Sequence, residues 1–165
     1  MSSSTIDNLK NYAKQNDLKI IKNTLIVVTL ISVTVFLFNF YSNRDHLYEY
    51  YRNELEFKGL AVHLIHLLAD IIFCAIVILI IFYTILYLYF IFYERITATL
   101  IITFLNTISL MYGLTEVNRD IGPTPLDILL GFIQVVLGFT YVYLMRSKTK
   151  MLSNQVVHQV HFVSS

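Results

Sequence analysis

Three ionisable side chains are spaced so that they would share one face of a helix. His63, His66 and Asp70 follow one another at intervals of three and four residues, and Glu56 lies seven residues before His63. At about 100° per residue, the first three side chains fall within roughly 60° of one another. Imidazole and carboxylate groups are ligands that zinc takes in proteins, and imidazole also relays protons near neutral pH. This set, called the His63/His66/Asp70 stripe below, is the first candidate for a metal site or a proton relay.

A plainer interpretation competes with both, because a polar stripe can simply face water or lipid headgroups. The spacing is not the HExxH motif of metalloproteases, which favours this plainer interpretation. A metal would need at least three ligands converging on one point at about 2.0–2.2 Å. The further carboxylate expected near the stripe is Asp127, which follows Gly122-Pro123-Thr124-Pro125. Asp127 would lie in the first turn of a helix, where a carboxylate faces the positive end of the helix dipole.

The elements that must position these residues are four long apolar runs. They are Ile20–Tyr41, Gly59–Tyr93, Ile96–Leu114 and Leu126–Met145. A helix needs about 20 apolar residues to cross the roughly 30 Å hydrocarbon core of a bilayer. The runs therefore predict an all-α, four-span transmembrane helix bundle over residues 20–145. Residues 1–19 are expected to form an amphipathic or disordered cytoplasmic tail, and residues 146–165 a second cytoplasmic tail.

The second run is too long to lie wholly inside the hydrocarbon. As one helix its 35 residues would measure roughly 52 Å. A span over residues 60–82 would leave eleven mostly apolar residues in water and would bury Asp70, which costs about 2.5–3.5 kcal/mol on insertion scales. A span over residues 71–93 avoids both costs. We therefore expect that span, with an outer extension from residue 59 that carries the His63/His66/Asp70 stripe at headgroup level.

Small and polar residues recur at helical spacing in the third and fourth runs. Thr99, Thr103 and Asn106 would share one face, and Gly131, Gln134 and Gly138 would share another. These two faces are expected to form a contact between the two helices. Small residues let membrane helices approach closely, and amides can hydrogen-bond between them. A pore lining is the alternative interpretation of the same faces.

The composition limits the function classes. The chain is 56% hydrophobic and 14% charged, whereas soluble domains carry about a quarter charged residues. A net charge of +1 predicts no nucleic acid or other polyanionic partner. Cys74 is the single cysteine, which excludes a thiol oxidoreductase that works through a cysteine pair. The first run holds no carboxylate of the kind that a four-helix multidrug carrier requires, and the sequence holds no glycine loop for phosphate.

The order of these parts resembles the small phosphate-starvation-inducible PsiE-like membrane proteins. The resemblance rests on four spans, a basic-flanked N-terminus, a long aromatic second span and Pro125-Leu126-Asp127 at the start of the last helix. It is strongest over residues 124–148 and covers about residues 59–148. The family carries a basic residue late in its third span, whereas residues 108–111 here are Ile-Ser-Leu-Met. The resemblance implies a membrane location, a helical fold and a link to phosphate limitation.

These observations predict a small multi-pass integral protein of the cell membrane with a structural or regulatory role, without enzymatic activity and without a cofactor. Its expected partners are the lipid bilayer and either further copies of itself or another membrane protein. Two alternatives stay open: a proton- or ion-coupled transport or channel component that uses the His63/His66/Asp70 stripe, and a membrane metal-binding protein or metalloenzyme that uses the same stripe with Asp127.

Both termini are predicted to be cytoplasmic. Eight basic residues flank the spans on the side of the termini, against four on the other side: Lys10, Lys14, Lys19, Lys22, Arg95, Arg146, Lys148 and Lys150, against Arg44, Arg52, Lys58 and Arg119. Basic residues concentrate on the cytoplasmic side of membrane proteins. Reporter fusions after Arg52 and after Ser165 should therefore report opposite sides of the membrane. Matching signals from the two fusions would refute the four-span topology.

Overall fold

A computed structural model describes residues 3–43, 60–116 and 123–163, with side chains described within 15–43, 66–115 and 123–150 and at Leu64. These residues form four helices and no strand: α1 (Ser3–Ser42), α3 (Leu60–Phe92), α4 (Ile96–Glu116) and α5 (Pro125–Val163). The all-α, four-helix prediction is confirmed. The second apolar run is one unbroken helix, as expected from its lack of proline.

Two helices extend beyond the predicted spans. Helix α1 begins at Ser3 rather than near Ile20, and α5 continues to Val163 rather than ending near Met145. Residues 3–19 and 146–163 therefore continue α1 and α5 as helix, and their cytoplasmic location stays a prediction. Neither stretch contains glycine or proline, and adding residues to an existing helix is far less costly than starting one.

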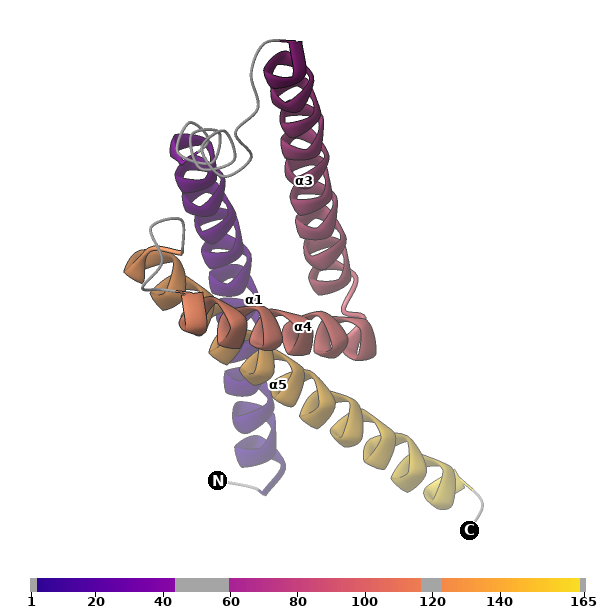
Figure 1. Cartoon of the computed structure of the whole chain (residues 1–165). Helices are drawn as coiled ribbons and strands as arrows, with labels where there is room; N and C mark the ends of the chain where they lie inside the picture. The colour runs from indigo at the N-terminus through magenta and orange to yellow at the C-terminus, as the bar shows by residue number, and fades with distance from the viewer. Residues whose placement is uncertain (1–2, 44–59, 117–122, 164–165) are drawn as a thin grey trace.

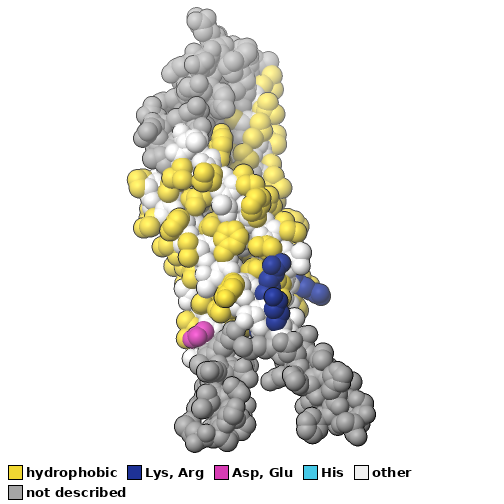
Figure 2. Space-filling view, turned by 90° about the horizontal axis from the view of Figure 1, so that it is seen from below, with side chains coloured by type: hydrophobic (Ala, Val, Ile, Leu, Met, Phe, Trp, Pro, Cys, Tyr) yellow, Lys and Arg dark blue, Asp and Glu magenta, His cyan; other side chains and the backbone are white. Residues whose placement is uncertain are grey.

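All four helices are long and apolar enough to cross a membrane. The qualifying segments are Gln15–Ser42, His66–Phe92, Ile96–Thr115 and Pro125–Lys150. Large apolar side chains point outward along them, and Figure 2 shows apolar atoms covering much of the visible face between its ends. A water-soluble protein rarely exposes so large a continuous apolar surface. The four segments therefore indicate a membrane protein, as their length and composition predicted.

The helices pack in a ring in which each contacts the next along the chain. Helix α5 packs along α1 and α4, and α3 contacts α1 and α4 less extensively. Figure 1 shows the start of α1 and the end of α5 on the same side of the molecule. We call the end where Glu94 and Arg95 join α3 to α4 the turn end, and the end where α1 stops and α5 starts the loop end.

The core is concentrated toward the turn end. Its buried side chains come from all four helices: Leu18, Leu25, Tyr87, Ile91, Ile102, Tyr141 and Met145. Near the loop end α3 stands apart from α4 and α5 in Figure 1. There α3 contacts α1 through Phe73, whose ring stacks on that of Phe40 with centroids 4.6 Å apart. Among the described residues, the buried side chains thus gather toward the turn end.

Helices α4 and α5 approach closely at Gly138. A Cβ atom at this position would lie 2.7 Å from both Oγ1 and Cγ2 of Thr103 and 3.0 Å from the Tyr87 hydroxyl. Thr99 and Thr103 are fully buried, and Asn106 and Gln134 are half-buried. The prediction that these two faces meet protein rather than lipid is confirmed. The contact needs a glycine because any side chain at 138 would occupy the position of Thr103.

Replacing Gly138 with alanine should lower the thermal stability of the purified protein in detergent. The added methyl group must push α4 and α5 apart, and overpacking of this kind costs typically about 1–3 kcal/mol. Gly131→Ala is the matched control, because its Cβ would meet only the flexible Leu110 side chain at 3.2 Å. That control should be neutral or stabilising, since alanine favours helix by up to about 1 kcal/mol over glycine. Equal melting temperatures for the two variants would contradict the close approach.

Candidate functional site

The His63/His66/Asp70 stripe lies on the part of α3 nearest the loop end. His66 and Asp70 are half-buried, and both interact with other residues of the chain. The His63 side chain, like that of Glu56, lies outside the described residues. Among the described side chains, no three His, Cys, Asp or Glu residues are grouped so that they could hold a metal ion. A metal site or relay completed by His63 therefore stays a prediction.

Asp127 belongs to a different cluster, at the start of α5. Its Oδ2 accepts hydrogen bonds from the Thr124 backbone N–H (2.9 Å) and the Thr124 hydroxyl (2.6 Å). The Asp127 N–H donates in return to Thr124 Oγ1 at 3.3 Å. This reciprocal pair is a capping box with aspartate in place of the usual glutamate. The prediction that Asp127 lies in the first turn of the last helix is confirmed.

Asn39 joins this cluster from α1. Its Nδ2 donates to Asp127 Oδ2 at 2.8 Å and to Thr124 Oγ1 at 3.2 Å. The other carboxylate oxygen, Asp127 Oδ1, is buried and accepts no hydrogen bond from the described residues. The cluster therefore links α1 to α5 at the loop end and leaves one carboxylate oxygen without a hydrogen bond from the described part of the chain. Asp127 is a half-buried ionisable group in a membrane helix, which makes it a functional candidate.

Polar side chains inside the bundle are used to hold helices together. The Thr103 hydroxyl donates to the Thr99 carbonyl at 2.8 Å, so the Tyr87 hydroxyl, 3.2 Å away, is the donor in that pair. One turn of α4 farther on, the Tyr83 hydroxyl donates to Asn106 Oδ1 at 2.6 Å. These bonds join α3 to α4. They give Tyr83 and Tyr87 partners inside the bundle, whereas Asn106 Nδ2 is buried without a hydrogen-bond partner among the described residues.

The second polar cluster surrounds the tight turn between α3 and α4. Glu94 adopts φ = 55°, the left-handed conformation that costs a non-glycine residue roughly 1–2 kcal/mol. Its N–H donates to the Ile91 carbonyl (3.3 Å), and the Arg95 N–H donates to the Phe90 carbonyl (2.9 Å). This pair of bonds is a Schellman motif, in which glycine is the usual residue at the position of Glu94.

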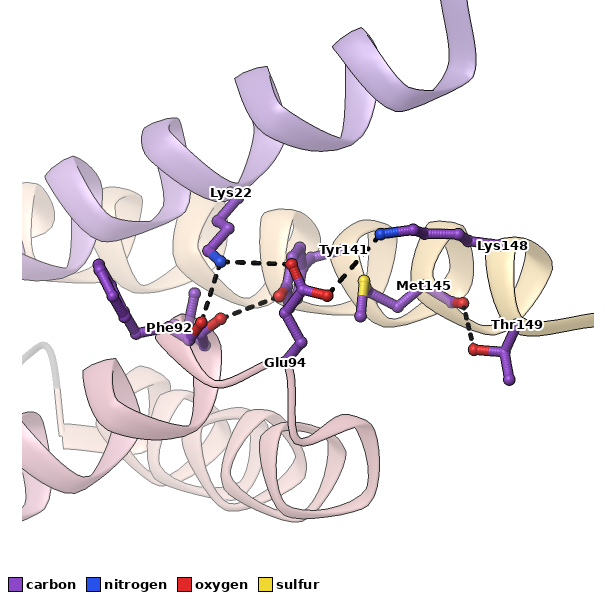
Figure 3. A network of polar contacts seen from close by, with 8 residues as sticks. Lys22, Phe92, Glu94, Tyr141, Met145, Lys148 and Thr149 are labelled. Atoms are coloured by element: carbon purple, nitrogen blue, oxygen red, sulfur yellow. Dashed lines mark hydrogen bonds and ion pairs between the residues drawn. The ribbon is translucent and has the colours of Figure 1, made fainter. Parts of the chain in front are cut away.

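Side chains from two other helices complete the end of α3. Lys22 of α1 donates to the Phe92 carbonyl at 3.1 Å and lies 5.3 Å from the centroid of the Phe92 ring. Tyr141 of α5 donates to the Ile91 carbonyl at 3.0 Å (Figure 3). The ammonium group of Lys22 is also favoured by the negative end of the α3 dipole. The carbonyls left over at the helix end thus find partners inside the protein.

Glu94 also forms ion pairs with two lysines, Lys22 and Lys148. Its Oε1 lies 3.5 Å from Lys22 Nζ, and its Oε2 lies 3.8 Å from Lys148 Nζ of α5 (Figure 3). The Glu94 and Lys148 side chains are 42% and 40% exposed, so each pair contributes only about 0–1 kcal/mol. The cluster contains no histidine, cysteine or second carboxylate. The cluster connects α1, the α3–α4 turn and α5, and it places the ammonium groups of Lys22 and Lys148 near one another.

Sequence reasoning identified Asp127 and the Glu94-Arg95 turn but missed the partners of both. Two signals would have pointed to them. Asn39 is an amide inside an apolar run, at the end that must lie level with Asp127. Glu94 is an acid in the turn between the second and third spans. In a four-span topology this turn lies on the same side of the membrane as the basic residues that flank the first and last spans.

Comparison with known proteins adds no family assignment. No protein-family model, curated protein or solved structure matches this chain. The resemblance to PsiE-like proteins therefore stays a prediction, and the geometry described above carries the functional argument.

Replacing Glu94 with glycine should give a more stable protein than replacing it with glutamine. Both variants lose the weak ion pairs with Lys22 and Lys148, but only glycine removes the cost of the left-handed conformation, about 1 kcal/mol. Melting temperatures of the two purified variants in one detergent test this expectation. A Glu94→Gly protein that melts below Glu94→Gln would show that contacts of the side chain, beyond its charge, fix the turn.

Proposed function

We propose that this chain is a small multi-pass integral protein of the cell membrane with a structural or regulatory role rather than a catalytic one. The observation that carries the proposal is the use made of its interior polar groups. Tyr83, Tyr87 and Tyr141 each bond another residue of the bundle. In hydrocarbon, polar groups without partners cost several kcal/mol each, so these bonds are what a stable membrane bundle requires.

The charge distribution supports the proposed orientation with both termini in the cytoplasm. Every Lys and Arg whose side chain is described lies toward the turn end, where α1 starts and α5 finishes: Lys19, Lys22, Arg95, Arg146, Lys148 and Lys150. Basic residues are retained on the cytoplasmic side during insertion. A link to phosphate limitation is the further part of the proposal that the PsiE-like resemblance supplies.

Proton- or ion-coupled transport is the second candidate function, and Asp127 is the specific observation that favours it. Its Oδ1 is buried and has no partner among the described residues, while its Oδ2 accepts three hydrogen bonds. A carboxylate inside a membrane helix is a common element of proton and ion pathways. Asp70, on the His63/His66/Asp70 stripe, is the other carboxylate that such a pathway would use.

Reconstitution of the full chain in liposomes separates the two functions. With a pH-sensitive dye inside and an imposed pH gradient, a structural protein should give no faster proton flux than protein-free liposomes. Flux that Asp127→Asn or Asp70→Asn abolishes would establish the transport function and refute the structural one. Resistance of the protein to extraction from native membranes by alkaline carbonate checks that it is integral. Release into the soluble fraction would refute both functions.

A further inference from the structure

The described charges are divided between the two ends of the molecule. Six cations lie toward the turn end together with two acids, Asp17 and Glu94, which leaves a net charge of +4 there. The described charges nearer the loop end are Asp70 and Asp127. Figure 2 shows lysine and arginine side chains next to one another beside the apolar surface. This end of the described molecule therefore attracts anions.

Most of these cations form no ion pair within the described part of the chain. Lys22 and Lys148 share the single carboxylate of Glu94. Arg95, Arg146 and Lys150 are exposed and form no ion pair with a described residue. An exposed cation keeps its attraction for an external anion, since no internal partner competes for it.

Exposed tyrosines show at which depth the cations lie. Tyr93, 60% exposed, is two residues before Arg95, and Tyr143, 72% exposed, is three residues before Arg146. Tyrosine is enriched at the boundary between hydrocarbon and headgroups, where its ring and hydroxyl suit the two media. Each arginine is therefore placed about one turn or less beyond that boundary, level with lipid phosphates.

We propose that Arg95, Arg146 and Lys150 form a binding surface for the headgroups of anionic phospholipids at the turn end. Lysine and arginine at the membrane surface attract anionic lipids through their positive charge. The inference rests on the membrane insertion in the proposed function. It does not depend on which side of the membrane the turn end occupies.

The absence of tryptophan from the sequence permits a site-specific test. A single tryptophan in place of Tyr93 reports lipids at the turn end, and one in place of Leu129, 55% exposed on the first turns of α5, reports the loop end. Each probe protein is reconstituted in vesicles that contain phosphatidylglycerol and phosphatidylcholine. Quenching by brominated chains on one lipid or the other gives the relative affinity for the two headgroups beside each probe.

At the turn-end probe, the relative affinity for phosphatidylglycerol over phosphatidylcholine should be about fivefold. This is the effect expected of one cation near an anionic surface. Arg95→Gln/Arg146→Gln/Lys150→Gln should abolish this preference, and the charge-conserving Arg95→Lys/Arg146→Lys/Lys150→Arg should retain it. The loop-end probe should respond equally in the original and neutralised proteins. High salt should weaken the turn-end preference in the original protein, which gives a test that needs no substituted cation.

Two results would overturn the inference. The first is equal affinity for the two lipids at the turn-end probe, and the second is a preference that neither the glutamine variant nor salt reduces. A lack of quenching at both probes would have a different meaning. It would show that the chain is not in the bilayer and would refute the proposed function together with this inference.

Discussion

The structure depends most on how the last carbonyls of α3 are satisfied. A helix leaves four carbonyls without internal partners at its C-terminal end. Here the Ile91 carbonyl accepts from the Tyr141 hydroxyl and from the Glu94 N–H of the turn, and the Phe92 carbonyl accepts from Lys22. Because Tyr141 belongs to α5 and Lys22 to α1, the C-terminal end of α3 is held against both of these helices at one height in the bundle. The tight turn then fixes the start of α4 beside them.

The other features of the bundle are arranged around this level. The buried core lies close to it, and so does the contact of Gly138 with Thr103 and Tyr87. Farther toward the loop end, contacts between α1 and its neighbours include the stacked rings of Phe40 and Phe73 and the bonds of Asn39.

The sequence predicted the helices well because the apolar runs and their two prolines leave little choice. It also predicted the contact faces of α4 and α5, since Thr99, Thr103 and Gly138 recur at helical spacing. It did not predict how far α1 and α5 extend, because polar residues 3–19 and 146–163 contain no apolar repeat that marks a span. The ion pairs of Glu94 were not predicted because they depend on the rotation of α1 and α5 about their axes, which hydropathy does not determine.

The two carboxylates that bind other helices differ in what stabilises their charge. Glu94 lies between two ammonium groups at the boundary with water, so its charge has partners of opposite sign. Among the described residues Asp127 has only neutral donors, from Thr124 and Asn39, together with the positive end of the α5 dipole.

Hydrogen bonds to a charged acceptor are roughly twice as strong as those between neutral groups. The hydrogen bond from Asn39 of α1 to Asp127 of α5 therefore gains strength from the negative charge of this carboxylate. Asp127 is thus a structural link between α1 and α5 as well as a buried ionisable group, so any further role of this carboxylate must act through the packing of α1 against α5.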